Sequence, residues 1–424
     1  MALRTSGGSG VLRFVRSGST LAGALLAAIV AWTALVDTAQ AADKRYGPGA
    51  SDTEIRIGQT VPFSGPASSF AIVARTEAAY MQMINAKGGI NGRKIDLIQA
   101  DDAFSPPRAV EQTRKLVESD GVLAIAGTVG TPSNLAIAKY LNTAKVPQIL
   151  AMSGSAALDN AALYPWTSPF YAPQVVEGRI AARYILNAKP DAKLAILFQN
   201  DEFGKGYLNA FKAELGSKAD SMIVKEEPYD LASPTIDSQI VSLKASGADA
   251  FFQATTPKFT AQAIRKAHEI GWKPLHVILA TSSQPSTTLK SAGLEASTGI
   301  VTSIWRKLPG NPEWDNDAAM KDYFAFMAQW APKEDPEDPT ALLGYIWSQM
   351  LVEVLHRCGD ELTRENLLKQ ATNVHDLQMP MFLPGIKINI TPESRTPWHS
   401  AQIVSFDGKD WMRTGGIITV PAKN

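Results

Sequence analysis

From Glu54 onward the chain alternates short apolar runs with amphipathic segments. Residues 54–61 alternate apolar and polar positions and stop at Pro62, which predicts a strand, and a helix over 69–86 follows a loop of small residues. Further strands are predicted at 95–99, 122–126, 148–151, 194–199, 223–226, 250–253 and 277–280. Further helices are predicted at 107–119, 174–187, 235–246, 258–270, 316–330, 340–357 and 363–371. Strands that alternate with helices are typical of βαβ units, so the pattern predicts an α/β fold with parallel sheets.

Three of the predicted strands end in loops of small and hydroxyl residues, at 62–70, 127–134 and 152–155. The carboxyl ends of parallel strands lie along one edge of a sheet, where ligands bind. Such loops also leave N–H groups free at a helix N-terminus, where a carboxylate is favoured. The loops therefore predict a ligand site, although the same residue types also form ordinary helix caps and turns.

The pattern of strands and helices starts again after residues 164–169. With 424 residues the chain is long enough for two domains with separate cores. Residues 332–339 are dense in Pro, Asp and Glu and are expected to form a surface loop. We therefore expect two α/β halves of similar architecture.

The N-terminus has the order of a secretory signal peptide, which we place at 1–41. Three arginines precede an apolar run over 21–36, and Ala39-Gln40-Ala41 follows. This run is shorter than the ~20 residues that a membrane-spanning helix needs. The only cysteine is Cys358, so no internal disulfide and no lipid anchor at the cleavage site are expected. We predict a periplasmic protein that is not embedded in the membrane after cleavage.

The charge balance and the motifs favour a binding protein over an enzyme. Basic and acidic residues both number 41, so no nucleic-acid partner is indicated. Residues 153–156 lack the second glycine of a hydrolase nucleophile elbow. His268-Glu269 lacks the second histidine of a zinc protease, and Gly204-Lys205-Gly206 is no phosphate loop. We expect no catalytic residue, no metal and no cofactor.

Four stretches resemble the periplasmic Leu/Ile/Val-binding proteins of ABC transporters. They are 55–65, 84–92, Asp101-Asp102 and 201–206, and NAKGGINGRKI at 85–95 is the most specific piece. The resemblance covers residues 53–424 and implies a type I periplasmic binding fold. Such a fold has two Rossmann-like lobes with parallel-rich central sheets, joined by three hinge crossovers, that close on a ligand.

The resemblance also implies where the two lobes begin and end. The N-terminal lobe would comprise 53–170 and 302–380, and the C-terminal lobe 171–301 and 381–424. The hinge crossovers would lie near 168–172, 300–303 and 379–384.

The candidate ligand-binding residues come from the first loop and from the resemblance. They are Ser64, Phe70, Gly130, Thr131, Ser153, Ser155, Phe203, Thr255 and Ser282. The resemblance assigns the ligand carboxylate to Gly130, Thr131, Ser153 and Ser155. For Phe70 and Phe203, packing in the core or between the lobes is the alternative to ligand contact.

Ser282 stands where the resemblance implies an acid that holds the ligand's ammonium group. An ammonium group buried without a countercharge loses bonding worth about 1.5–3 kcal/mol. Asp201 or Glu202 could supply a carboxylate from another direction. The ligand is therefore expected to be a branched-chain or other apolar amino acid, or else an amine-free aromatic or aliphatic carboxylate.

The resemblance implies a solute-binding component of an ABC importer whose partners are a small-molecule solute and the permease subunits. A ligand sensor that reports to a membrane receptor is the second alternative, because both use the same closing lobes.

Overall fold

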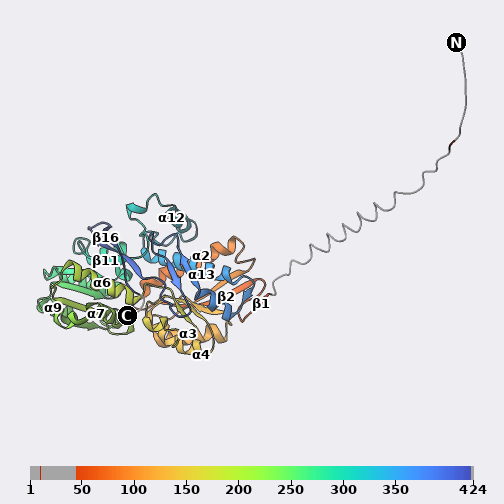
Figure 1. Cartoon of the computed structure of the whole chain (residues 1–424), viewed down its shortest axis with the longest axis horizontal. Helices are drawn as coiled ribbons and strands as arrows, with labels where there is room; N and C mark the ends of the chain where they lie inside the picture. The colour runs from red at the N-terminus through yellow and green to blue at the C-terminus, as the bar shows by residue number, and fades with distance from the viewer. Residues whose placement is uncertain (1–9, 11–43, 422–424) are drawn as a thin grey trace, which may run out of the picture. The chain divides into compact units, whose positions relative to one another are not determined.

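Two parallel-rich β-sheets organise the part of the chain that the structure, a computed structural model, describes: residue 10 and residues 44–421. Residues from Arg45 onward form one compact unit, and Figure 1 shows helices packed around both sheets. The predicted signal peptide lies, apart from residue 10, outside the described residues.

The smaller sheet has five strands in the order β3-β2-β4-β5-β6, and all its pairs are parallel. Its strands are β2 (Glu54–Val61), β3 (Lys94–Asp101), β4 (Ala124–Ala126), β5 (Gln148–Ala151) and β6 (Thr167–Pro169). Its helices are α2 (Ala71–Ala86), α3 (Pro106–Glu118), α4 (Thr131–Thr143), α12 (Ala318–Trp330), α13 (Pro339–Cys358) and α14 (Arg364–Ala371). Strands β4 and β5 are buried along their whole length, as expected for parallel strands covered on both faces.

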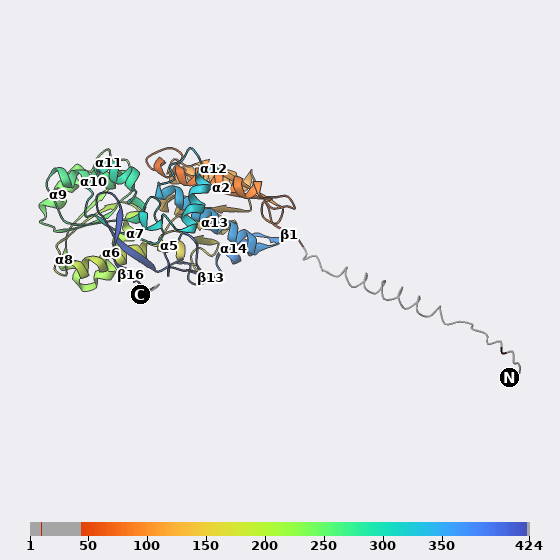
Figure 2. The ribbon, with the colours of Figure 1, turned by 90° about the horizontal axis from the view of Figure 1, so that it is seen from above.

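The larger sheet has seven strands in the order β16-β15-β11-β10-β9-β7-β8. Its strands are β7 (Leu194–Gln199), β8 (Ile223–Tyr229), β9 (Ala250–Ala254), β10 (Leu275–Ile278), β11 (Val301–Ile304), β15 (Ser400–Phe406) and β16 (Trp411–Thr419). Only the pairs made by β15 are antiparallel. Its helices are α6 (Gln174–Ala188), α7 (Glu202–Leu215), α8 (Ala219–Met222), α9 (Asp237–Ala245), α10 (Pro257–Glu269) and α11 (Lys290–Ala292), grouped together in Figure 2.

Short elements complete the described chain. They are β1 (Arg45–Tyr46) paired with β12 (Glu361–Leu362), β13 (Val374–Leu377) paired with β14 (Ile388–Ile390), α5 (Ala156–Asp159), and the turns η1 (Ser68–Phe70), η2 (Gly216–Lys218), η3 (Ala280–Ser282), η4 (Pro285–Leu289) and η5 (Pro312–Trp314). The prediction of an α/β fold with two parallel-rich lobes is confirmed. The predicted strand at 277–280 is shifted, because Ala280 already belongs to the turn η3.

The chain crosses between the two sheets after β6, after β11 and before β15. The second crossover lies slightly later than predicted, because residues 301–304 still pair with β10 and β15. It runs beside the third, since Arg306 and Phe382 form an isolated antiparallel bridge. The second and third crossovers therefore run antiparallel beside each other.

One aromatic cluster joins all three crossovers. Phe170, Trp305 and Phe382 come from the first, second and third crossover, and Trp398 contacts all three. The ring centroids of Trp305 and Trp398 lie 4.5 Å apart. All four rings are buried. Aromatic contacts of this kind each add about 0.5–1.5 kcal/mol beyond the area they bury, so the cluster stabilises the hinge.

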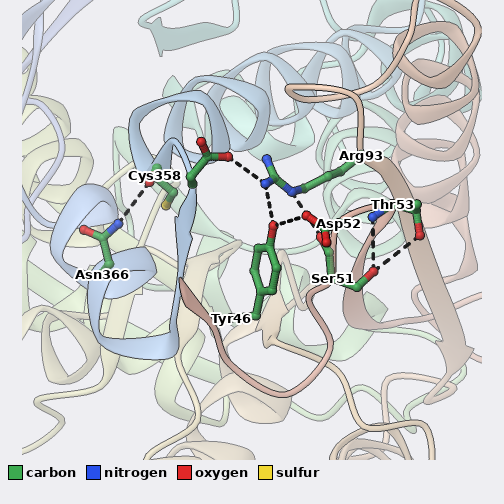
Figure 3. Close-up of polar contacts among 8 residues, drawn as sticks. Tyr46, Ser51, Asp52, Thr53, Arg93, Cys358 and Asn366 are labelled. Carbon is green, nitrogen blue, oxygen red and sulfur yellow. Dashed lines mark hydrogen bonds and ion pairs between the residues drawn. The ribbon is translucent and has the colours of Figure 1, made fainter. Parts of the chain in front are cut away.

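Arg93, from the most specific piece of the family resemblance, anchors the segment before β2 (Figure 3). Its side chain is 2% exposed and donates to the carbonyl of Ser51, to the Tyr46 hydroxyl at 2.7 Å and to the Asp360 carboxylate at 2.6 Å. The Tyr46 hydroxyl in turn donates to Asp52 at 2.8 Å. Arg93 therefore stabilises the fold next to the two-stranded sheet of β1 and β12.

Candidate functional site

A small cavity lies between the loops at the carboxyl ends of strands from both sheets. The space open to the centre of a water-sized sphere is about 40 Å³, and one water needs about 10–15 Å³ by this measure. The residues that line it are Phe70, Val73, Phe104, Val129, Gly130, Thr131, Met152, Ser153, Gly154, Tyr171, Phe203, Tyr207, Thr256, Thr281 and Leu343. The cavity is mostly apolar and suits a small ligand.

Two hydroxyls mark the polar corner of this cavity. Thr131 Oγ1 and Ser153 Oγ lie 2.8 Å apart, and both residues are 2% exposed. Thr131 is the first residue of α4, and the first N–H groups of a helix have no partner within the helix and carry its positive end. This corner therefore offers two hydroxyl donors and a helix N-terminus to a carboxylate.

Two glycines let the backbone approach this corner closely. A Cβ on Gly130 would lie 2.3 Å from the Phe104 ring, and one on Gly154 would lie 1.9 Å from the carbonyl oxygen of Ala172. Gly130 also has φ +98°, a conformation that side chains disfavour. Any larger residue at these positions would displace a wall of the cavity.

Aromatic rings form part of the cavity lining. Phe70 ends the turn η1, and Phe203 lies in the first turn of α7, where its ring meets Tyr207 edge to face at 5.2 Å. The carboxylate of Asp201 caps α7 by accepting from the N–H groups of Phe203 and Gly204. Asp201 is thus committed to the helix and is not among the residues that line the cavity.

Four further hydroxyl-bearing residues line the cavity: Tyr171 on the first crossover, Tyr207 on α7, and Thr256 and Thr281 in loops of the larger sheet. The Tyr171 hydroxyl donates to Thr281 Oγ1 at 2.8 Å. The Tyr207 hydroxyl donates to Glu177 at 3.0 Å, and the N–H of Ala280 donates to the other Glu177 oxygen at 2.6 Å. Burial raises the pKa of Glu177 to about 7. Both oxygens of this carboxyl are engaged behind the cavity wall.

Four of the predicted site residues do not line the cavity. Ser64 is exposed and donates to the Asp101 carboxylate at 2.6 Å, while Ser155 is buried next to Ser153. Ser282 donates to the carbonyl of Thr255 at 2.6 Å, so these two residues bond to each other. Their neighbours Thr256 and Thr281 line the cavity instead. The structure brings together the other five: Phe70, Gly130, Thr131, Ser153 and Phe203.

Ten lining residues were not among the predicted site residues: Val73, Phe104, Val129, Met152, Gly154, Tyr171, Tyr207, Thr256, Thr281 and Leu343. Val129, Met152 and Gly154 lie inside the small-residue loops at 127–134 and 152–155, so their place in these loops could have identified them as candidate site residues. Tyr171 lies on the first crossover and Leu343 on α13, where the sequence pattern gave no indication of a site.

Trp347 of α13 fixes two of the site's strand ends from behind. Its Nε1 donates to the carbonyl of Leu150 at 2.8 Å. Gly127 has φ +69°, and a Cβ there would lie 2.4 Å from the Trp347 ring. Trp347 lies 197 positions after Leu150 in the sequence. Its buried indole thus sets the course of the loops that carry Thr131 and Ser153.

Two α/β sheets linked by three crossovers, with a ligand-sized cavity at their strand ends, define a two-lobed solute-binding protein. The chain belongs to the periplasmic binding protein family, whose model matches residues 54–410. The resemblance found in the sequence is thereby confirmed.

Relatives with curated names agree with this assignment. The chain is 27% identical over 238 residues to an amino acid binding protein of Pseudomonas aeruginosa, covering 51% of this chain and 58% of the relative. It is 25% identical over 242 residues to a Leu/Ile/Val-binding protein homolog of Brucella suis, covering 55% of this chain and 60% of the relative. The match thus spans about three fifths of these relatives' lengths.

Solved structures share the fold at low sequence identity. A substrate-binding periplasmic protein from Ralstonia solanacearum has a TM-score of 0.76 at 22% identity, covering 85% of this chain and 100% of its own. A Thermus thermophilus branched-chain amino acid ABC transporter protein with bound valine has a TM-score of 0.76 at 15% identity, covering 88% of this chain and 98% of its own. An R. palustris solute binding protein in complex with benzoate has a TM-score of 0.72 at 18% identity, covering 87% of this chain and 98% of its own.

Within residues 44–421, no helix is both long and apolar enough to cross a bilayer.

Proposed function

We propose that this chain is the periplasmic solute-binding component of an ABC importer. Its family and the names of its relatives support this role, and so does the signal peptide predicted at 1–41. In this proposal the lobes, 53–170 with 305–380 and 171–304 with 381–424 once the second crossover is placed after β11, close on the solute by movement at the three crossovers. The permease subunits are the expected partners.

The solute we propose is a small, amine-free aromatic or aliphatic carboxylate. One observation carries this proposal: none of the described residues that line the cavity is Asp, Glu, His, Lys or Arg. The hydroxyls of Thr131 and Ser153 and the α4 N-terminus can hold a carboxylate, while apolar and aromatic side chains surround the remainder.

An α-amino acid fits this lining less well. Its ammonium group would be buried without a carboxylate partner, because the hydroxyl of Ser282 points to the Thr255 carbonyl and Glu177 is engaged behind the wall. Such a loss is about 1.5–3 kcal/mol, or roughly 10- to 150-fold in affinity.

Calorimetry on the purified mature protein tests the proposal. The ligands are benzoate, 4-methylpentanoate and leucine, and the last two differ chiefly by the amino group. We expect a dissociation constant near the micromolar range, about 8 kcal/mol, for at least one amine-free acid. Leucine should bind at least tenfold more weakly than 4-methylpentanoate. Tighter binding of leucine would overturn the amine-free assignment, and no binding of any solute across a broad thermal-shift screen would overturn the transport role.

A further inference from the structure

A buried arginine stands at the second crossover without a hydrogen-bonding partner. Arg306 is 2% exposed, and among the described residues no side-chain or backbone oxygen accepts a hydrogen bond from its guanidinium. The guanidinium carbon lies 4.9 Å from the centroid of the Trp305 ring. Arginine keeps its charge in proteins, so this is a buried positive charge with weak compensation.

The acids that face Arg306 are engaged elsewhere. Tyr171, Glu177, Asp338 and Tyr323 interact with it electrostatically. Both oxygens of Glu177 accept other hydrogen bonds, and its pKa is raised to about 7 by burial. Asp338 caps α13 by accepting from the N–H of Thr340, and burial raises its pKa as well. Near neutral pH these groups compensate the arginine only in part.

Arg306 stands next to the cavity wall. Phe170 and Trp305, the residues that precede Tyr171 and Arg306, both pack on Trp398. Tyr171 interacts with Arg306 electrostatically, its hydroxyl bonds to Thr281, and both Tyr171 and Thr281 line the cavity. Arg306 itself does not line it. Arg306 lies on the second crossover and Tyr171 on the first.

We propose that Arg306 makes the cavity select anionic solutes over neutral ones of the same shape, acting through the Tyr171–Thr281 wall rather than by direct contact. This proposal rests on the function proposed above and adds that the charge preference comes from a positioning residue outside the lining. A tenfold preference corresponds to about 1.4 kcal/mol, which two unit charges provide at roughly 12 Å in a medium of effective dielectric constant about 20.

Pairs of isosteres test the proposal: benzoate with benzamide, and 4-methylpentanoate with 4-methylpentanamide. Their dissociation constants are measured by calorimetry at pH 8 for wild type, Arg306→Met and Arg306→Lys. We expect Arg306→Met to reduce the ratio of acid to amide affinity at least tenfold, and Arg306→Lys to keep most of it. Arg93→Met is the matched control, because Arg93 is equally buried but lies at the end of the sheet that carries β1. It should lower the melting temperature and leave the ratio unchanged.

A second variant, which should raise the acid-to-amide ratio rather than lower it, keeps the test decisive if Arg306→Met does not fold. Glu177→Gln removes the acid that offsets Arg306, so at pH 8 it should raise the acid-to-amide ratio threefold or more. A lowered or unchanged ratio in Glu177→Gln would overturn the proposal, as would an unchanged ratio in a folded Arg306→Met. If wild type binds neither of these acids nor any other amine-free carboxylate in the thermal-shift screen, the proposed solute class and this inference both fall. If wild type binds an acid but the variants keep its ratio, only the inference falls.

Discussion

Replacing Thr131 and Ser153 by alanine, singly and together, tests the polar corner of the cavity. A hydroxyl that donates to a carboxylate is worth about 1.5–3 kcal/mol, and the hydrogen bond that joins the two hydroxyls is worth about 0.5–1.5 kcal/mol. Either single substitution removes one donor but frees the other hydroxyl from that mutual bond. The second substitution has no such compensation. Each single variant should therefore lose roughly 1 kcal/mol of binding, and the double variant clearly more than the sum of the two.

The measurement is calorimetry with benzoate or 4-methylpentanoate, whichever binds wild type. We expect the double variant to lose about 2.5–3.5 kcal/mol, roughly 70- to 400-fold in affinity, of which about 0.5–1.5 kcal/mol is the coupling between the two sites. Thr143→Ala is the control, because that hydroxyl lies at the other end of α4 and bonds to the Lys139 carbonyl. Strictly additive losses would refute the idea that the two hydroxyls share one ligand group. Unchanged affinity in the double variant would show that the carboxylate binds elsewhere.

Three further predictions concern stability. Trp347→Phe leaves the buried Leu150 carbonyl without its donor and should cost about 1–3 kcal/mol in urea unfolding; an unchanged midpoint would contradict this. Arg93→Met, which loses the hydrogen bond to Asp360, should cost about 2 kcal/mol without changing ligand affinity, and weaker binding would argue against a purely structural role. Glu177 has a folded-state pKa of about 7, above its ordinary value, so folding binds a proton and stability falls as pH rises toward 7. Glu177→Gln should flatten that fall between about pH 4.5 and 7, and an unaltered slope would assign the fall to other groups.

The sequence predicted the architecture well, because it depends on local periodicity. The alternation of apolar runs and amphipathic segments located most strands and helices of both sheets to within a few residues, since buried parallel strands and amphipathic helices each carry a distinct period. The short strands β6 and β11 were not among the predicted strands. The antiparallel edge formed by β15 and β16 was not among the predicted strands. Its pairing with β11 depends on residues a hundred positions apart.

The candidate site was predicted only in part, for reasons of register and distance. In the larger sheet the candidates were Thr255 and Ser282, whereas Thr256 and Thr281 face the cavity. In a loop, a shift of one residue decides which side chain points to the ligand. The residue types in the loop do not show which of two neighbouring residues faces the cavity. Leu343 reaches the cavity from a helix distant in sequence, so only the folded chain shows its place.

The paired indoles of Trp305 and Trp398 make the hinge optically visible. Two indoles with centroids 4.5 Å apart couple electronically, and the sign and size of the resulting circular dichroism depend on the angle between them. Because Trp305 lies on the second crossover and Trp398 follows the third, any rotation that repacks the crossovers changes that angle. The unlabelled protein thus carries its own spectroscopic readout of hinge motion, independent of the chemistry of the solute.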